Sequence, residues 1–139
     1  MREIKFKYYY KNKHTKEIIS KIRDIETIED TEFEIINLEN EHLELLDRCQ
    51  YTGLKDKNGK EIYEGDIVKG VFEFEYEIDE DLWKTARENI MGEVVFQFGC
   101  FGVLFEDDCF KSLYEAILSK IEVIGNIYEN PELLEENND

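Results

Sequence analysis

The sequence predicts a mainly β protein of the α+β class, and three features of its 139 residues support this. Short stretches alternate charged and hydrophobic residues with a period of two, which is the pattern of half-buried strands. Glycine and Asn-Gly turn signals separate several of these stretches. Only short helical segments are expected between them. A length of 139 residues is enough for one compact domain or two small subdomains that share a core, and a hydrophobic content of 42% is too high for a disordered chain.

The first predicted elements form a β-hairpin. Residues 3–10 alternate hydrophobic and charged side chains, and an apolar stretch follows over 16–25, where the isoleucine spacing also suits a helix. A further strand is expected near 32–38, and a turn or short helix from Asn40. These elements make up an α+β N-terminal part of the chain.

Residues 51–68 contain glycines that favour turn geometry. Asn58-Gly59 predicts a two-residue type I′ hairpin turn, because both residue types accept positive φ. That register opposes residues of like charge: Lys57 with Lys60, and Asp56 with Glu61. Gly65 predicts a second turn, after which a strand begins. Glycines spaced every six residues match neither the dinucleotide-binding nor the P-loop pattern, so we expect no phosphate site here.

The next segment, residues 71–91, predicts an acidic strand followed by a helix. Four hydrophobic residues are expected to face inward along the strand: Phe72, Phe74, Tyr76 and Ile78. Acidic residues at 79–81 suit the positive end of a helix dipole. Leu82, Ala86 and Ile90 share one face of the predicted helix, and Gly92 ends it.

The C-terminal third predicts short alternating elements. In order these are strands over 93–98 and 103–106 joined by a turn at 99–102, a two-turn helix over 112–119 opened by a capping box, a strand over 120–128, and a helical turn over 132–136.

The charge distribution limits the partners that we expect. Residues 1–24 hold eight basic and three acidic residues, or +5, so the remainder of a chain of net charge −17 carries −22. An acidic body repels phosphates, so direct nucleic-acid binding is not expected. No apolar run approaches the roughly 20 residues that span a bilayer, and the N-terminus lacks a signal-peptide core. We therefore expect no membrane partner and a cytoplasmic location.

The reactive residues do not predict a catalytic or cofactor site. Cys49, Cys100, Cys109, His14 and His42 lack the spacing of a metal finger, so we expect no metal, no cofactor and three reduced thiols. Neighbouring carboxylates arise by composition among 34 acidic residues. An enzyme, such as a small hydrolase, is the alternative that the sequence supports least.

Three segments carry a family resemblance: the start of the chain through Phe6, residues 51–68, and Ile124-Gly-Asn-Ile-Tyr-Glu-Asn-Pro131. In their residues and in their order along the chain, these segments resemble the YopX family of phage and prophage proteins. Lys7-Tyr8-Tyr9-Tyr10 departs from the pattern that usually follows the first motif. The resemblance implies a C-terminal barrel of the SH3 type, a phage-encoded intracellular setting, and no particular activity. We place the N-terminal α+β piece at 1–48, the barrel at 49–130 with an acidic insertion near 71–91, and a short helix and tail at 131–139.

Two functional hypotheses remain beside the enzyme. The first is a non-catalytic module that binds a host or phage protein through its barrel rim and acidic insertion. The rim candidates are Tyr51, Tyr63, Asp66, Asn126 and Tyr128. The second is a nucleic-acid mimic whose carboxylate row, Glu73, Glu75 and Glu77, occupies a basic DNA-binding protein.

Self-association through the N-terminal hairpin is also predicted. Tyr8 and Tyr10 place aromatic rings on a strand expected at a sheet edge, where one face needs a cover. The unlike charges of the two parts of the chain favour the same contact. A two-fold dimer is its simplest form.

Overall fold

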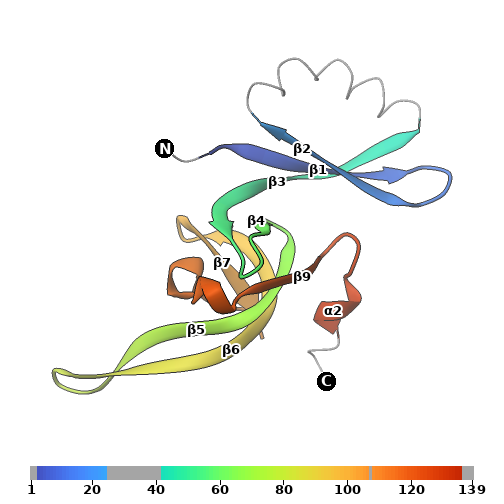
Figure 1. The fold of residues 1–139 in the computed structure, drawn as a ribbon. Helices are drawn as coiled ribbons and strands as arrows, with labels where there is room; N and C mark the ends of the chain where they lie inside the picture. The colour runs from blue at the N-terminus through green and yellow to red at the C-terminus, as the bar shows by residue number, and fades with distance from the viewer. Residues whose placement is uncertain (1–2, 25–41, 107, 136–139) are drawn as a thin grey trace. The chain divides into compact units, whose positions relative to one another are not determined.

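The computed structural model describes residues 3–24, 42–106 and 108–135, and it is mainly β as predicted (Figure 1). The chain divides into two units, Met1–Gly53 and Leu54–Asp139. The strand expected near 32–38 and the turn expected from Asn40 lie outside the described residues.

In the first unit, β1 (Lys5–Asn12) pairs antiparallel with both β2 (Ile18–Asp24) and β3 (Leu43–Lys55). The predicted hairpin is confirmed, and its second arm is a strand rather than a helix. The sequence did not predict β3, because charged residues interrupt its apolar ones. The sheet has the order β2-β1-β3-β4, and β3 leads the chain across Gly53 into the second unit, to which β4 (Glu61–Tyr63) belongs.

The second unit contains a five-stranded antiparallel sheet of order β8-β7-β6-β5-β9. Its strands are β5 (Asp66–Asp79), β6 (Leu82–Gln97), β7 (Cys100–Phe105), β8 (Cys109–Ser112) and β9 (Glu122–Asn126). The strand predicted over 120–128 is confirmed in a shorter form. The SH3-type closure of this sheet stays a prediction.

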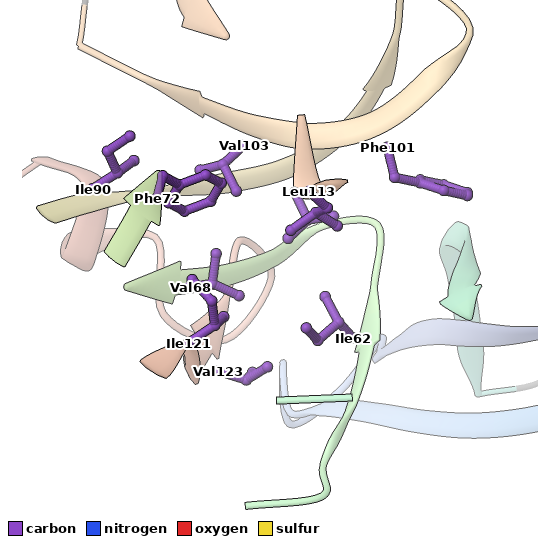
Figure 2. Packing of buried hydrophobic residues seen from close by; sticks show 10 residues of the cluster. Ile62, Val68, Phe72, Ile90, Phe101, Val103, Leu113, Ile121 and Val123 are labelled. Carbon is purple, nitrogen blue, oxygen red and sulfur yellow. The ribbon is translucent and has the colours of Figure 1, made fainter. Parts of the chain in front are cut away.

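The core of this unit lies on one side of the sheet, where buried side chains from several strands meet (Figure 2). The cluster comprises Ile62, Val68, Phe72, Ile90, Val94, Phe101, Val103, Leu113, Ile121 and Val123. Residues two apart on a strand share a face, so Val68 and Phe72 point to the same side of β5. The inward orientation predicted for Phe72 is confirmed.

The helix predicted from the acidic run at 79–81 to Gly92 is wrong, because this segment is the first part of β6. Leu82, Ala86 and Ile90 are four residues apart, a spacing that places them on one face of a helix but equally on one face of a strand. Pairing with β5 along twelve register positions decides for the strand. Asp81 has φ +61°, which an aspartate tolerates in the tight turn between β5 and β6.

The two-turn helix predicted over 112–119 is wrong as well. Two 3-10 helices stand there, η1 (Leu113–Glu115) and η2 (Leu118–Lys120). The Oγ of Ser112 accepts a hydrogen bond from the N–H of Tyr114, as a capping residue does. The chain then becomes extended at Ala116, which forms an isolated bridge with Phe72. This contact with β5 ends the helix after one turn.

Two further predictions concern a turn and the last helix. The turn between β6 and β7 comprises Phe98 and Gly99 alone, because Gln97 pairs with Cys100. The helical turn after Pro131 is confirmed as α2 (Glu132–Glu135).

Candidate functional site

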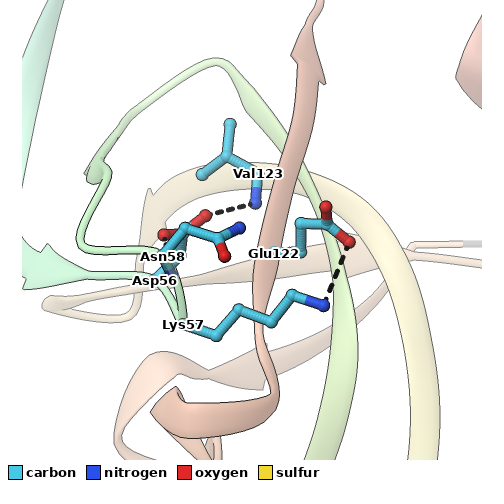
Figure 3. A network of polar contacts seen from close by, with 5 residues as sticks. All are labelled: Asp56, Lys57, Asn58, Glu122 and Val123. Atoms are coloured by element: carbon cyan, nitrogen blue, oxygen red, sulfur yellow. Dashed lines mark hydrogen bonds and ion pairs between the residues drawn. The ribbon is translucent and has the colours of Figure 1, made fainter.

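The turn at 56–60 is organised by the carboxylate of Asp56 (Figure 3). One oxygen accepts the N–H groups of Asn58 and Lys60, each at 2.9 Å, and the other accepts the N–H of Val123 in β9, also at 2.9 Å. The predicted type I′ turn is wrong: Gly59 has φ +78°, whereas Asn58 is not left-handed. A turn of this kind, with only its last residue left-handed, opposes Asp56 to Lys60 and so avoids the like-charged pairs.

The surroundings of Asp56 keep its carboxylate ionised. Burial would raise the pKa of Asp56, but the three N–H groups and the charge of Lys60 outweigh burial and lower the pKa below its ordinary value. The N–H of Lys57 also donates to the carbonyl of Ile121 at 2.8 Å. Asp56 therefore connects the turn to β9, and its role is structural.

Two of the predicted rim residues stabilise turns. Asp66 is 2% exposed, and its carboxylate accepts the N–H of Tyr63 at 2.9 Å. Asn126 is opposite Asp66 in the β5–β9 register, and its side-chain oxygen accepts the N–H groups of Tyr128 at 3.0 Å and Glu129 at 2.8 Å. The first turn precedes β5 and the second follows β9. The side chains of both residues therefore stabilise the turns at the ends of these strands.

The three rim tyrosines are divided between buried and half-buried positions. Tyr51 and Tyr63 are buried, and Tyr128 is half-buried. The hydroxyl of Tyr63 donates to the carboxylate of Glu61 at 3.0 Å. Three of the five rim candidates, Tyr51, Tyr63 and Asp66, are therefore buried. Asn126 and Tyr128 are the two that remain partly accessible.

Tyr8 and Tyr10 are buried, and β1 lies between β2 and β3 rather than at an edge. Their rings stack with centroids 6.5 Å apart and pack with Leu43. Two premises of the self-association prediction, an edge position and an uncovered aromatic face, are therefore wrong. Self-association itself stays a prediction.

A run of exposed apolar side chains lies on the hairpin of β5 and β6, which extends beyond the other strands of its sheet (Figure 1). We call residues 73–87 the arm. From the base outward, exposure rises from buried Phe72 through half-buried Phe74 to Tyr76 at 44% and Ile78 at 48%. Leu82 at 53% and Trp83 at 57% complete the tip. The inward orientation predicted for Tyr76 and Ile78 is wrong.

The base of the arm is covered, whereas its outer part is not. The ammonium of Lys111 in β8 lies 3.8 Å from the ring centroid of Phe74, within the range of a cation–π contact. Tyr76 is paired with Lys84, and directly opposed residues share a face of a hairpin. The apolar stripe therefore leaves the core along β5 and continues into solvent with Lys84 beside it on β6. An exposed contiguous patch of this kind marks interaction surfaces in soluble proteins.

The other face of the arm is acidic. Glu73, Glu75 and Glu77 alternate along β5, and the arm holds six acidic and two basic residues, or −4. Arg87 lies opposite Glu73, with its Nε 2.9 Å from the carboxylate. Trp83 lies opposite Glu77.

The sequence already contained the signal for this surface. The alternation over 72–78 predicts a strand with one hydrophobic face. With 82–90 as a helix, that face has only the core to pack against, whereas with 82–90 as a second strand the hairpin extends into solvent.

The described residues hold no group of three or more His, Cys, Asp or Glu able to bind a metal. Cys49 is buried, Cys100 half-buried and Cys109 exposed, and all three are free thiols. None of the helices in the described ranges combines the length and apolar character needed to cross a membrane.

Comparison with protein families matches residues 2–135 to the model described as YopX protein. No curated protein matches the chain. Among solved structures, protein EF1440 from Enterococcus faecalis is similar, with 26% identity over 93% of this chain and 97% of that chain, and a TM-score of 0.46.

Proposed function

The chain belongs to the YopX family, and from this premise we propose that it is a non-catalytic protein-interaction module that binds its partner with the arm. The proposal includes the setting implied by the resemblance, a phage or prophage protein acting in the cytoplasm of a bacterial host. It also includes an SH3-type arrangement of the second unit, which would serve as the rigid base of the arm.

One observation carries the proposal: the hydrophobic stripe on the arm remains exposed although it is continuous with the core. Ile78 and Leu82, at the end of the stripe, are each about half exposed, and Trp83, which lies on the acidic face opposite Glu77, is 57% exposed. Full burial of such a side chain contributes roughly 1.5–3 kcal/mol, so a partner that covers the exposed half of each gains about half of that per side chain. The acidic face selects a partner surface that carries basic residues around an apolar groove.

The nucleic-acid mimic is the weaker candidate, because its carboxylate row is interrupted. Glu73 is paired with Arg87, and Glu77 lies beside Trp83 rather than beside another acid. Successive carboxylates on one strand face stand about 6.6 Å apart. With Glu73 paired, Glu75 and Glu77 are the two members of the row left to imitate phosphates.

The experiment compares the intact chain with an Ile78→Ser/Leu82→Ser variant as bait in a host-cell lysate. The proposal expects a partner that the intact chain retains, that binds again when purified, and that the variant loses. Retention should persist at raised salt, because apolar burial is screened less than charge. A partner released steeply by salt, and identified as a DNA-binding protein, would favour the mimic.

The matched control is Ile19→Ser/Ile22→Ser, which removes two exposed isoleucines from β2 in the first unit. The control should retain the partner. Equal loss by both variants, or equal retention by both, would contradict binding through the arm.

A further inference from the structure

A cleft of about 440 Å³ lies in the second unit, and core residues take part in its lining: Ile90 belongs to the core cluster and Phe105 packs against it. Val71 and Met91 line it, and both precede or follow a core residue by one position on their strands, so they point away from the core. A volume of this size falls within the roughly 300–1,000 Å³ typical of small-molecule sites. None of the residues that line the cleft belongs to the arm.

Charged side chains of opposite sign line the cleft from different strands. Lys69 belongs to β5 and Lys120 to η2, which leads into β9, whereas Glu88 belongs to β6 and Glu106 follows β7. In the sheet order β7-β6-β5-β9, Glu88 and Glu106 thus come from one side and Lys69 and Lys120 from the other, while Glu122 in β9 lies opposite Lys69. Strands two apart in a sheet are roughly 10 Å apart, which sets the scale of this separation.

These four charges are available to a ligand. Among the described residues, neither lysine forms an ion pair with a carboxylate, and the Glu88 and Glu106 carboxylates have no cationic partner. Lys57 and Glu122, which also line the cleft, are 3.5 Å apart and satisfy each other. The concentration of lysine is unusual for a unit in which eight basic residues face 22 acidic ones.

We propose that this cleft binds an elongated zwitterion, a molecule whose carboxylate and ammonium are separated by an apolar stretch. The carboxylate would lie between Lys69 and Lys120, the ammonium at Glu106, and the apolar stretch over Val71 and Met91. A molecule with a single charge leaves the groups at one end unsatisfied. An ω-amino acid and the C-terminal lysine of a peptide both have the required chemistry.

The test observes Met91 directly, because the chain has two methionines and methyl-labelled protein gives one resonance for each. The full chain is titrated with 6-aminohexanoate, hexanoate and hexylamine, and Met91→Leu assigns the signal. The proposal expects a saturable shift of the Met91 resonance with 6-aminohexanoate and at least tenfold weaker binding of the two singly charged molecules. A peptide that ends in lysine and binds more tightly than 6-aminohexanoate supports the same site with a chain end as its ligand.

Charge-removing variants complete the test. Lys69→Gln and Lys120→Gln should each weaken 6-aminohexanoate binding about tenfold, the factor that 1.4 kcal/mol represents. Lys84→Gln, on the arm and outside the cleft, is the matched control and should leave binding unchanged. Hexanoate binding as tightly as 6-aminohexanoate would overturn the proposal. So would the lack of any shift at about 10 mM ligand, tenfold above a Kd of about 1 mM.

Discussion

At the scale of single residues, Asp56 shows how one carboxylate can hold together segments far apart in the chain. It receives hydrogen bonds from its own turn and from Val123, which is 67 positions away. The bond to Val123 also occupies a backbone N–H of β9, which is the last strand in the order of its sheet. Edge strands with unpaired backbone groups are prone to wrong pairing, so this bond protects the fold as well as stabilising it.

We therefore predict that Asp56→Asn destabilises the protein. Hydrogen bonds to a charged group contribute about 1.5–3 kcal/mol, and the free energy of unfolding should fall by about that amount in urea denaturation at pH 7. Glu75→Gln, which changes an exposed carboxylate, is the control and should stay within about 0.5 kcal/mol. Equal effects of the two changes would contradict the role given to Asp56.

The same residue predicts a pH dependence. The pKa of Asp56 is lower in the folded than in the unfolded chain, so its contribution is fully present above the unfolded value of about 3.9 and is lost as the pH falls through the folded value. The difference in stability between the intact chain and Asp56→Asn should therefore shrink under acid. A difference that stays constant between pH 7 and pH 3 would refute this linkage.

Gly65 is required for its backbone conformation. Its φ is +85°, its N–H donates to the carbonyl of Val94 at 2.8 Å, and its carbonyl accepts the N–H of Ile127 at 2.9 Å. We predict that Gly65→Val lowers the free energy of unfolding by more than about 1 kcal/mol, because a β-branched residue is strained at positive φ. Lys57→Gln and Lys60→Gln should stay within about 0.5 kcal/mol. Similar losses from all three would exclude a special role of the glycine.

Phe98 has a left-handed backbone conformation, which is strained for this residue type, and its side chain is not buried in a way that would compensate for the strain. Its φ is +54°, it precedes Gly99 at +78°, and its side chain is 85% exposed. Two consecutive left-handed residues define a type I′ turn, in which asparagine is preferred at this position. We predict that Phe98→Asn raises stability by about 0.5–1 kcal/mol, since relief of roughly 1–2 kcal/mol of strain exceeds the loss of an exposed contact with Phe110. Thermal unfolding measures the gain, and a lower melting temperature would contradict it.

At the scale of elements, the arm is a hairpin that contributes surface rather than core. Two-stranded ribbons are at best marginally stable alone, and the residues beyond the Phe74–Ala86 pair are exposed on both strands. Its base is braced by Lys111 and by the bridge between Phe72 and Ala116. The arm can therefore project from the sheet without being part of the cooperative core.

We predict that the arm can be shortened without unfolding the protein. Replacing residues 75–85 by Asn-Gly joins Phe74 to Ala86 through a favourable hairpin turn. The free energy of unfolding in urea should change by less than about 1 kcal/mol, whereas partner binding should be lost. An unfolded product would show that the arm stabilises the core and would contradict the division between base and tip.

At the scale of the whole molecule, the charge pattern still favours association between copies. The basic segment 1–24 belongs to a chain whose remainder carries −22. With Tyr8 and Tyr10 buried, the hairpin surface available for contact is that of β2, where Ile19 and Ile22 are exposed and which is the end strand in the order of the described sheet.

Light scattering of the intact chain should therefore give a mass above the monomer at low salt, and Ile19→Lys/Ile22→Lys should give the monomer. Raising the salt should weaken the association, because exposed charges are screened beyond about 10 Å at 0.1 M. If the intact chain is a monomer under every condition, the prediction of self-association is wrong.

The sequence by itself determined the elements whose signals are local. The alternation over 3–10, the glycine at 65 and the proline at 131 predict a strand, a turn and a helix start that the structure contains. Each depends on backbone sterics or on a period within a few residues. The class of the fold followed from these elements.

Only the tertiary structure decided what faces what. The spacing of Leu82, Ala86 and Ile90 fits a helix and a strand equally, and pairing with β5 made it a strand. Asp66 is a buried hydrogen-bond acceptor, whereas the ring of Tyr76 is exposed. Both follow from one cause, because the burial of a residue depends on how far the neighbouring strands extend beside it. Those neighbours are distant in sequence, as Val123 is from Asp56, so no local pattern encodes them.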